Sequence, residues 1–127
     1  PDYSSAASDV YKRQILVPLG LLQAERTATY TAYAPNGSKH AVEFYVTIPF
    51  DQKFATHGNG TMIALSAPTM LALEQFHRLG LSSGGTDEGA PGLREEGSDV
   101  SYAYIRDLDG NKICAFYSGA EKLSAHE

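Results

Sequence analysis

Hydrophobic and polar residues alternate along several short segments of the chain, and a period of two is typical of β-strands. The clearest segment is 41–48, where Val42, Phe44, Val46 and Ile48 share one face and Glu43, Tyr45 and Thr47 the other. Weaker or shorter patterns predict further strands at 21–27, 29–34, 61–66, 100–106 and 112–117. Between the second and third strands, Pro35-Asn36-Gly37 predicts a turn, since Asn-Gly is a strong hairpin signal.

Two segments have helical character. Residues 10–17 predict a short helix that Pro18 and Gly20 end. A second helix is predicted after Pro68, with Thr69 as its cap, because Leu73, Phe76 and Gly80 recur on one helical face. Gly84-Gly85 is expected to end it, and residues 86–99, which hold several glycines and a proline, are predicted to form a long loop.

The order of these elements predicts an internal repeat. Helix-strand-strand-strand is followed by strand-helix-loop-strand-strand, which divides a single domain at 10–118 into module one (10–57) and module two (58–118). Residues 1–9 are small, polar and aperiodic, so we interpret them as a foreign or disordered leader. The polar tail at 119–127 is expected to fray.

Composition narrows the class of protein. The chain has 127 residues, of which 43% are hydrophobic, which suits one domain with a modest core. The net charge is -5 and Lys and Arg form no run, which argues against a nucleic-acid partner. Its apolar stretches are too short to span a membrane. A single cysteine excludes an intrachain disulfide and, without a visible signal peptide, predicts a cytoplasmic location.

A set of motifs in the second half resembles a known family. The run Gly60 to Pro68 looks like a first strand, Phe76-His77 and Gly84 to Arg94 like the helix and following segment, and Tyr104 to Ile113 like a closing hairpin. In that hairpin Leu108 replaces the usual proline of an Asp-Pro-Asp-Gly-Asn core. Together they resemble a βαβββ module of the vicinal oxygen chelate superfamily, the glyoxalase, bleomycin-resistance and extradiol-dioxygenase group.

The resemblance implies an α+β fold in which paired βαβββ modules form a cupped mixed sheet, and it implies a homodimer. In module one the likeness is thinner. Residues 16–21 are similar to the end of the family's first helix, but the strand that should precede this helix is not recognisable in residues 1–9.

The family's metal positions are altered here. Its members hold a divalent metal in the cup with His and Glu from the first and last strands of each module. The second-module histidine position falls on Met62 and the glutamate position on Cys114, while Glu43 or Tyr45 could point inward from module one. A thioether, a thiol and one carboxylate suit hard divalent cations poorly, so the predicted site is degenerate and a divalent metal is disfavoured.

The same positions predict a ligand pocket. If Met62 and Cys114 face the cup, then Tyr102, Tyr104 and Phe116 face it too, and Arg94 in the predicted loop could meet an anion. The opposite face would be core, formed by Ile63, Leu65, Ala103, Ile105, Ile113 and Ala115. Two alternatives stay open: the tyrosines fill a closed barrel-like core or a dimer contact, and Arg94 pairs with Glu95 or Glu96 or is simply exposed. The predicted ligand-binding residues are Glu43, Tyr45, Met62, Arg94, Tyr102, Tyr104, Cys114 and Phe116.

Three functions compete. The first is a protein that binds a small organic molecule, of the glyoxalase or bleomycin-resistance type, with a degenerate metal site. The second is a divalent-metal-dependent lyase, isomerase or dioxygenase of the same superfamily, and the third is a protein-interaction module without a ligand. No nucleophile–base pair or phosphate loop is visible, so no catalytic residue is assigned.

Overall fold

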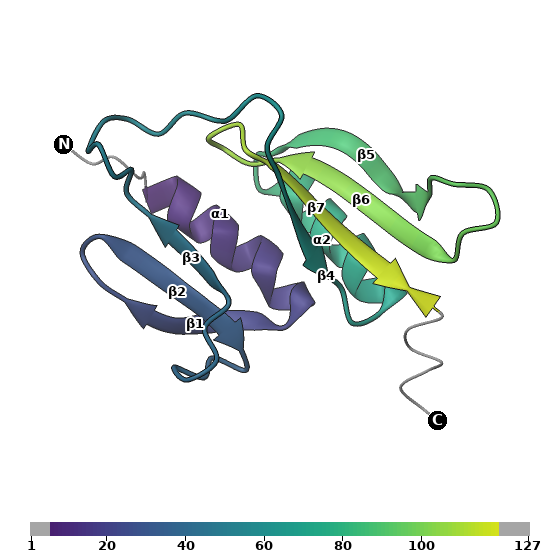
Figure 1. The fold of residues 1–127 in the computed structure, drawn as a ribbon, viewed down its shortest axis with the longest axis horizontal. Coiled ribbons are helices and arrows are strands. Elements are labelled where there is room, and N and C mark those ends of the chain that lie inside the picture. Colours follow the sequence, from purple (N-terminus) through teal and green to yellow (C-terminus); the bar gives the residue numbers. More distant parts are fainter. Residues whose placement is uncertain (1–5, 120–127) are drawn as a thin grey trace.

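The computed structural model describes residues 6–119 (Figure 1). These residues form two helices, one 3-10 turn and seven strands. The strands make two sheets, with the strand orders β1-β2-β3 and β4-β7-β6-β5. The elements are α1 (Ala6–Leu16), η1 (Val17–Leu19), β1 (Leu21–Arg26), β2 (Tyr30–Pro35), β3 (Phe44–Thr47), β4 (Met62–Ser66), α2 (Met70–Ser82), β5 (Thr86–Leu93), β6 (Val100–Arg106) and β7 (Lys112–Ser118).

The two halves of the described chain have similar element orders. Module two runs β4-α2-β5-β6-β7, with β4 parallel to β7 and the remaining pairs antiparallel. Module one runs α1-β1-β2-β3, and residues 6–119 contain no strand ahead of α1. The α+β fold is therefore confirmed, with a four-stranded sheet in module two and a three-stranded sheet in module one.

The long loop predicted at residues 86–99 is wrong, because its first half is strand β5. Glycine and proline argued against a strand there, but β5 lies at the edge of its sheet, where a missing proline N–H breaks no ladder. Its pairing with β6 shifts register between Asp87 and Gly89 and again between Gly89 and Gly92, so bulges absorb the unfavourable residues.

Two boundaries in module one also differ from the sequence prediction. Helix α1 begins at Ala6, so it extends into the segment interpreted as a leader, of which residues 1–5 lie outside the described part. Strand β3 covers only Phe44–Thr47 of the predicted 41–48, because the backbone N–H of Ala41 donates to Ser38 in a turn. The turn at Asn36 and Gly37 has the expected positive φ angles of 55° and 71°.

Helix α2 follows its sequence signals. The Thr69 hydroxyl accepts a hydrogen bond from the backbone N–H of Ala72 at 3.0 Å, which caps the first turn. Leu73, Phe76 and Gly80 form its buried face as predicted. A side chain at Gly80 would stand 2.8 Å from Ile105, so the glycine lets α2 approach the sheet closely.

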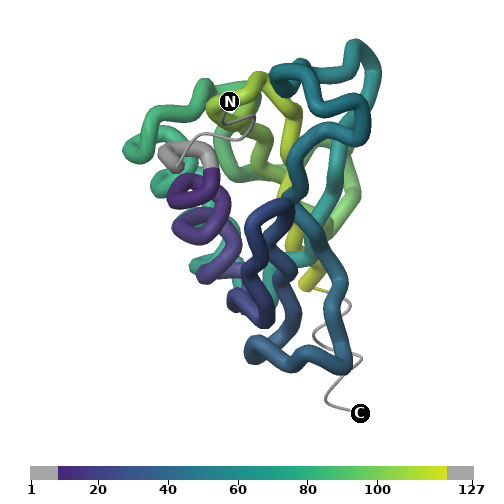
Figure 2. The backbone as a smooth tube through the Cα atoms, turned by 90° about the vertical axis from the view of Figure 1, so that its left-hand side faces the viewer, coloured from purple at the N-terminus to yellow at the C-terminus, as the bar shows by residue number. Residues whose placement is uncertain are grey.

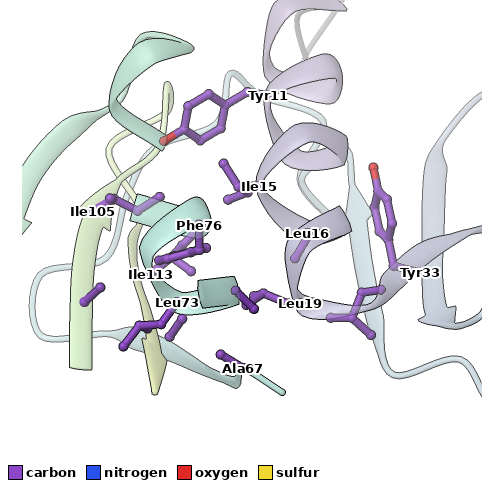
Figure 3. Close-up of a cluster of buried hydrophobic side chains, with 14 residues drawn as sticks. Tyr11, Ile15, Leu16, Leu19, Tyr33, Ala67, Leu73, Phe76, Ile105 and Ile113 are labelled. Carbon is purple, nitrogen blue, oxygen red and sulfur yellow. The ribbon is translucent and has the colours of Figure 1, made fainter. Parts of the chain in front are cut away.

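The core lies where the two helices meet the sheet of module two (Figure 3). Ile15 and Leu16 on α1 face Phe76 on α2, while Tyr33 packs on the other side of α1. Ala103, Ile105, Ile113 and Ala115 are all buried in this core, which confirms the predicted orientation of β6 and β7. Burial of these apolar side chains is the main stabilising contribution.

Ile63 is an exception to the predicted core, since 38% of it is exposed. It lines a cavity of 230 Å³ between β3 and β4, together with Phe44 and Val46. Strand β4 lies at the edge of its sheet, and β3 lies at the edge of the other. The cavity therefore separates two sheet edges that have no neighbouring strand among residues 6–119.

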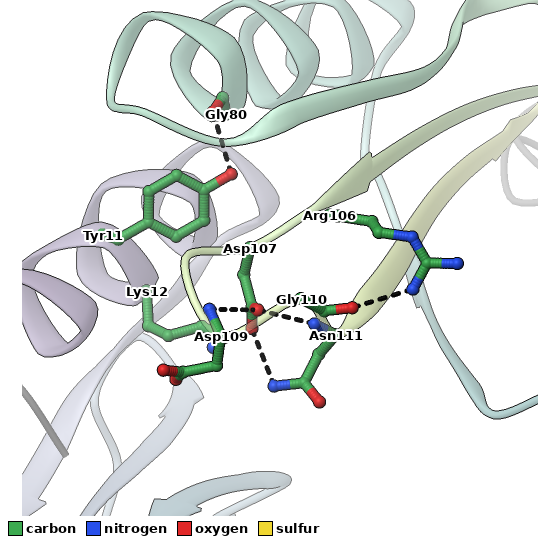
Figure 4. Close-up of polar contacts among 8 residues, drawn as sticks. All are labelled: Tyr11, Lys12, Gly80, Arg106, Asp107, Asp109, Gly110 and Asn111. Atoms are coloured by element: carbon green, nitrogen blue, oxygen red, sulfur yellow. Dashed lines mark hydrogen bonds and ion pairs between the residues drawn. The ribbon is translucent and has the colours of Figure 1, made fainter. Parts of the chain in front are cut away.

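The predicted hairpin turn at 107–111 is organised by the Asp107 carboxylate (Figure 4). Its Oδ1 accepts from the backbone N–H groups of Asp109 and Asn111, at 3.0 and 2.8 Å, and its Oδ2 accepts from the Asn111 amide at 3.1 Å. Lys12 of α1 forms a buried ion pair with the same carboxylate. The hairpin residues are thus structural, and they join module two to α1.

Viewed from the side, α1 lies on one face of the molecule and the segment between β3 and β4 on the opposite side (Figure 2). The helices pack on the face of the β4-β7-β6-β5 sheet that carries Ile105 and Ile113, so the opposite face of this sheet is not covered by a helix from the described residues. Within residues 6–119 no helix is both long and apolar enough to cross a membrane.

Candidate functional site

The uncovered face of the module-two sheet brings several predicted site residues together. Tyr104 pairs with Cys114, and Tyr102 with Phe116, across β6 and β7. Ala64 of β4 pairs with Cys114 on the other side. Because paired residues in a sheet point to the same side, these side chains share one surface. We call Tyr102, Tyr104, Cys114 and Phe116 the aromatic face.

The rings of the aromatic face contact one another. Tyr102 and Tyr104 are stacked, with ring centroids 6.1 Å apart and an interplanar angle of 11°. Phe116 lies 6.4 Å from Tyr102 in a tilted arrangement. All three are only partly buried, so they form a surface of contiguous ring edges and faces beside solvent. Such surfaces suit small organic ligands because they offer apolar area with polar tips.

Two cations lie over this surface. The Arg94 guanidinium carbon is 5.4 Å from the Tyr104 ring centroid and Lys112 Nζ is 5.3 Å from it, both within cation–π range. Arg94 is exposed, which was one of its predicted alternatives, and it has no ion pair with Glu95 or Glu96 in the described structure. Its guanidinium donates to the backbone carbonyls of Ala90 and Gly92. The guanidinium is therefore held in place over Tyr104 without a carboxylate partner among the described residues.

Gly89 shapes this end of the face. A side chain there would meet the Tyr104 ring at 2.8 Å and the Arg94 guanidinium at 3.0 Å. The β5 backbone thus comes close to both groups, and only glycine leaves room for that approach. The register shifts of β5 lie on either side of Gly89, and Arg94 directly follows the end of this strand.

Cys114 is the buried member of the aromatic face, with 1% of its surface exposed. Burial raises the pKa of its thiol, and the positive charges of Arg94 and Lys112 oppose that rise only in part. Burial also raises the pKa of Tyr104, with a further contribution from Cys114. Both groups are accordingly neutral at physiological pH, and the formal charges closest to them are those of Arg94 and Lys112.

Met62 belongs to the edge of this surface. It pairs with Lys112 across β4 and β7, two residues before the Ala64–Cys114 pair. The residue is 45% exposed. Met62 and Cys114 therefore point to the same side of the sheet, as the sequence predicted.

Glu43 and Tyr45 lie elsewhere. Both belong to the module-one side, where Glu43 precedes β3 and lines a separate cavity with Leu21 and Leu65. Tyr45 is 58% exposed and packs edge-to-face on Tyr30, at a centroid distance of 5.6 Å. Neither residue has a contact with the aromatic face in the described part of the chain.

The arrangement fits a mononuclear metal site poorly. Within the described ranges no group of three or more His, Cys, Asp or Glu side chains lies close enough to hold a metal ion. The two residues that the sequence resemblance matched to metal ligands in module two are Met62, an exposed thioether, and Cys114, a buried thiol with a raised pKa. Metal binding by Cys requires the thiolate, which burial disfavours here.

Sequence reasoning missed Lys112. It lies two residues before Cys114 on β7. The period of two that put Cys114 and Phe116 on one face of the strand therefore puts Lys112 on that face as well. Arg106 extends this side of β6, but its charge is neutralised by an ion pair with Glu88. Arg94 and Lys112 are thus the cations of this surface that have no acidic partner among residues 6–119.

A further polar pair lies away from the face. His77 is largely buried on α2, and its Nε2 lies 2.9 Å from Asp87 Oδ1. The hydrogen bond from His77, and a second from the backbone N–H of Gly89, hold the pKa of Asp87 below its ordinary value. This contact ties α2 to the start of β5.

Several solved structures have a fold similar to that of this chain. The chain is 33% identical to a glyoxalase/bleomycin resistance protein from Albidiferax ferrireducens, with a TM-score of 0.74 over 87% of each chain. A glyoxalase/bleomycin resistance protein/dioxygenase family enzyme from Burkholderia phytofirmans is 16% identical, with a TM-score of 0.61 over 91% of this chain and 90% of the other.

A glyoxalase-related enzyme from Fulvimarina pelagi has the same identity of 16% and TM-score of 0.61, over 88% of this chain and 78% of the other. These two more distant likenesses concern the fold alone. No protein-family model and no curated sequence matches the chain. The identity and coverage of the Albidiferax structure, together with the βαβββ order of module two, show that the chain belongs to the glyoxalase/bleomycin resistance protein family of the vicinal oxygen chelate superfamily.

Proposed function

We propose that the protein binds a small organic molecule on the aromatic face of module two, and that its family-type metal site is degenerate. The observation that carries the proposal is the stacked pair Tyr102–Tyr104 with two cations over it. Contiguous rings of this kind are common in ligand sites because they give a large contact area at a small entropic cost. A homodimer and a cytoplasmic location stay predictions.

The degenerate metal site follows from the donor set. Met62 and Cys114 occupy the positions where the family places histidine and glutamate, and Glu43 and Tyr45 lie away from them. Neutral sulfur groups do not replace the hard oxygen and imidazole donors that suit divalent cations. The chemistry we assign is therefore binding, and no reaction step is derived.

Thermal shift and calorimetry against a panel of aromatic and aliphatic small molecules test the binding function. At least one aromatic compound is expected to stabilise the protein, and Tyr104→Leu is expected to abolish that stabilisation. Tyr30→Leu is the matched control, since it removes a half-buried tyrosine from β2 of the other sheet. Stabilisation by no compound, or equal loss in both variants, would contradict the proposal.

Elemental analysis tests the metal assignment separately. Protein purified without a chelator is expected to hold far less than one equivalent of Fe, Mn, Ni or Zn. Stoichiometric metal that Cys114→Ser or Met62→Leu removes would overturn the degenerate site and favour a metal-dependent lyase, isomerase or dioxygenase.

A further inference from the structure

We infer that the aromatic face selects planar organic anions, such as aromatic carboxylates, over neutral or cationic compounds of the same shape. This inference rests on the proposed binding function and deepens it by naming the class of ligand. It depends on charges that lie at the face, and on the way in which the fold holds them there.

The first step is the charge balance. The whole chain has a formal net charge of -5, so a generic surface patch would repel anions. Over Tyr104, however, lie Arg94 and Lys112, and neither has an ion-pair partner in the part of the chain that the structure describes. A local positive potential on an acidic protein favours anionic ligands and accelerates their association.

The second step is the anchoring of Arg94. Carbonyl groups of Ala90 and Gly92 accept its hydrogen bonds, so the guanidinium is positioned without losing its charge. A guanidinium has five N–H donors, and its contacts with these carbonyls leave further donors for a ligand oxygen. Arg106 provides the contrast on the same strand as Tyr104, because Glu88 neutralises it.

The third step is the shape of the surface. The ring planes of Tyr102 and Tyr104 are nearly parallel, at 11°, and Phe116 extends the apolar area beside Tyr102. A planar ring can lie against this row while its anionic group reaches toward Arg94 and Lys112.

Calorimetric titration with 2-naphthoate, in buffer containing a chelator, tests the inference on the full chain. The neutral 2-naphthamide and the cationic 2-naphthylmethylammonium ion have the same ring system and serve as matched ligands. The anion is expected to bind at least about tenfold more tightly than either, since hydrogen bonds to charged groups are the stronger ones. Its affinity should fall as salt is raised, because the cations are near the surface.

Charge-removing variants locate the site. Arg94→Gln and Lys112→Gln are each expected to weaken 2-naphthoate binding by about tenfold while leaving 2-naphthamide binding nearly unchanged. Lys39→Gln is the matched control, because Lys39 is exposed in a module-one turn and its removal changes net charge equally. Circular dichroism and melting temperature show whether each variant is folded.

The outcomes separate the two proposals. Equal affinity for the three naphthyl compounds, or tighter binding of the cation, would overturn the anion preference and leave the binding function standing. Loss of affinity in Lys39→Gln equal to that in Arg94→Gln would also overturn it. If no naphthyl compound binds but another member of the small-molecule panel does, the ligand class is wrong; if nothing binds, the binding function itself fails.

Discussion

The two modules of this protein share an element order but differ in completeness. In module two, β4 pairs parallel with β7 and closes a four-stranded sheet. In module one the corresponding place beside β3 has no strand among residues 6–119, and a cavity of 230 Å³ lies there. The buried side chains of β6 and β7 contrast with β3, whose residues are all half-buried or exposed.

This difference between the two sheets indicates which module is better suited to hold ligand-binding side chains in fixed positions. A sheet supports a side-chain constellation only when neighbouring strands fix its backbone, and Tyr104 has β5 on one side and β7 on the other. Tyr45 lies on a strand with one neighbour and is largely exposed. We therefore expect stability and binding to depend mainly on module two, and the following predictions test that expectation.

Asp107→Ala is expected to have the largest effect. The substitution removes the acceptor of the hairpin N–H groups and leaves the Lys12 ammonium buried without a partner. Loss of one member of a buried ion pair costs about 3–5 kcal/mol in the free energy of unfolding. Urea denaturation measures it, with the exposed Asp51→Ala as control; similar midpoints for the two variants would contradict the structural role of the hairpin.

Phe76→Ala compares the cores of the two modules. Phe76 is fully buried between α2 and the sheet, so its removal is expected to cost about 3–5 kcal/mol. Phe44 on β3 is only half-buried, and Phe44→Ala should cost roughly half as much. Chemical denaturation of both variants provides the measurement. An equal cost would mean that module one is packed as completely as module two.

Tyr33→Phe is expected to stabilise the protein or leave it unchanged. Tyr33 is fully buried, and its hydroxyl has no hydrogen-bond partner within the described part of the chain. Burial raises the pKa of this phenol to about 12. Removing an unsatisfied buried hydroxyl can gain about 1 kcal/mol. A loss of stability of that size in thermal unfolding would reveal a partner for the hydroxyl and a better-formed module one.

Asp87→Asn is expected to have the smallest effect, and one that depends on pH. His77 and the Gly89 N–H lower the pKa of Asp87 in the folded state, so its contribution to stability is complete above its unfolded pKa. That contribution is lost as the pH falls below about 4, through the lower folded pKa. The variant should thus be less stable than the parent at pH 7 and approach it in acid.

Urea midpoints between pH 7 and pH 3 test this pH dependence, with Glu96→Gln as an exposed control. A difference between Asp87→Asn and the parent that stays constant over the whole range would contradict the assigned link between His77 and Asp87.

The sequence was informative where a pattern is local. The alternation of residues predicted strands β6 and β7 correctly. It put Ile105 and Ile113 on the face that packs on the helices, and Tyr104 and Cys114 on the opposite face. The Thr69 cap and the Asp107 turn followed from short-range chemistry. Strand β5 was missed because glycine and proline usually exclude a strand, and only its edge position and its bulges make them acceptable.

The cations of the site were harder to predict, because their contacts are not local in sequence. Arg94 follows the bulged strand β5 and lies over Tyr104, whereas the sequence favoured an ion pair with Glu95 or Glu96, or plain exposure, over a place above the cup. Lys112 was overlooked, although it lies two residues from Cys114 on β7 and therefore on the same face of the strand. Glu43 and Tyr45 were included because module one was expected to contribute to the cup; whether they bind a ligand stays a prediction.

The most direct test of the central claim is an amide NMR titration of the isotope-labelled protein with 2-naphthoate, which reports both modules at once. The account predicts that shift changes concentrate on Tyr102 to Arg106 of β6, on Lys112 to Phe116 of β7 and around Arg94, while β1, β2 and β3 stay unchanged. Changes concentrated on β1 to β3, or along the cavity beside Ile63, would contradict it and place the ligand in the less complete half of the molecule.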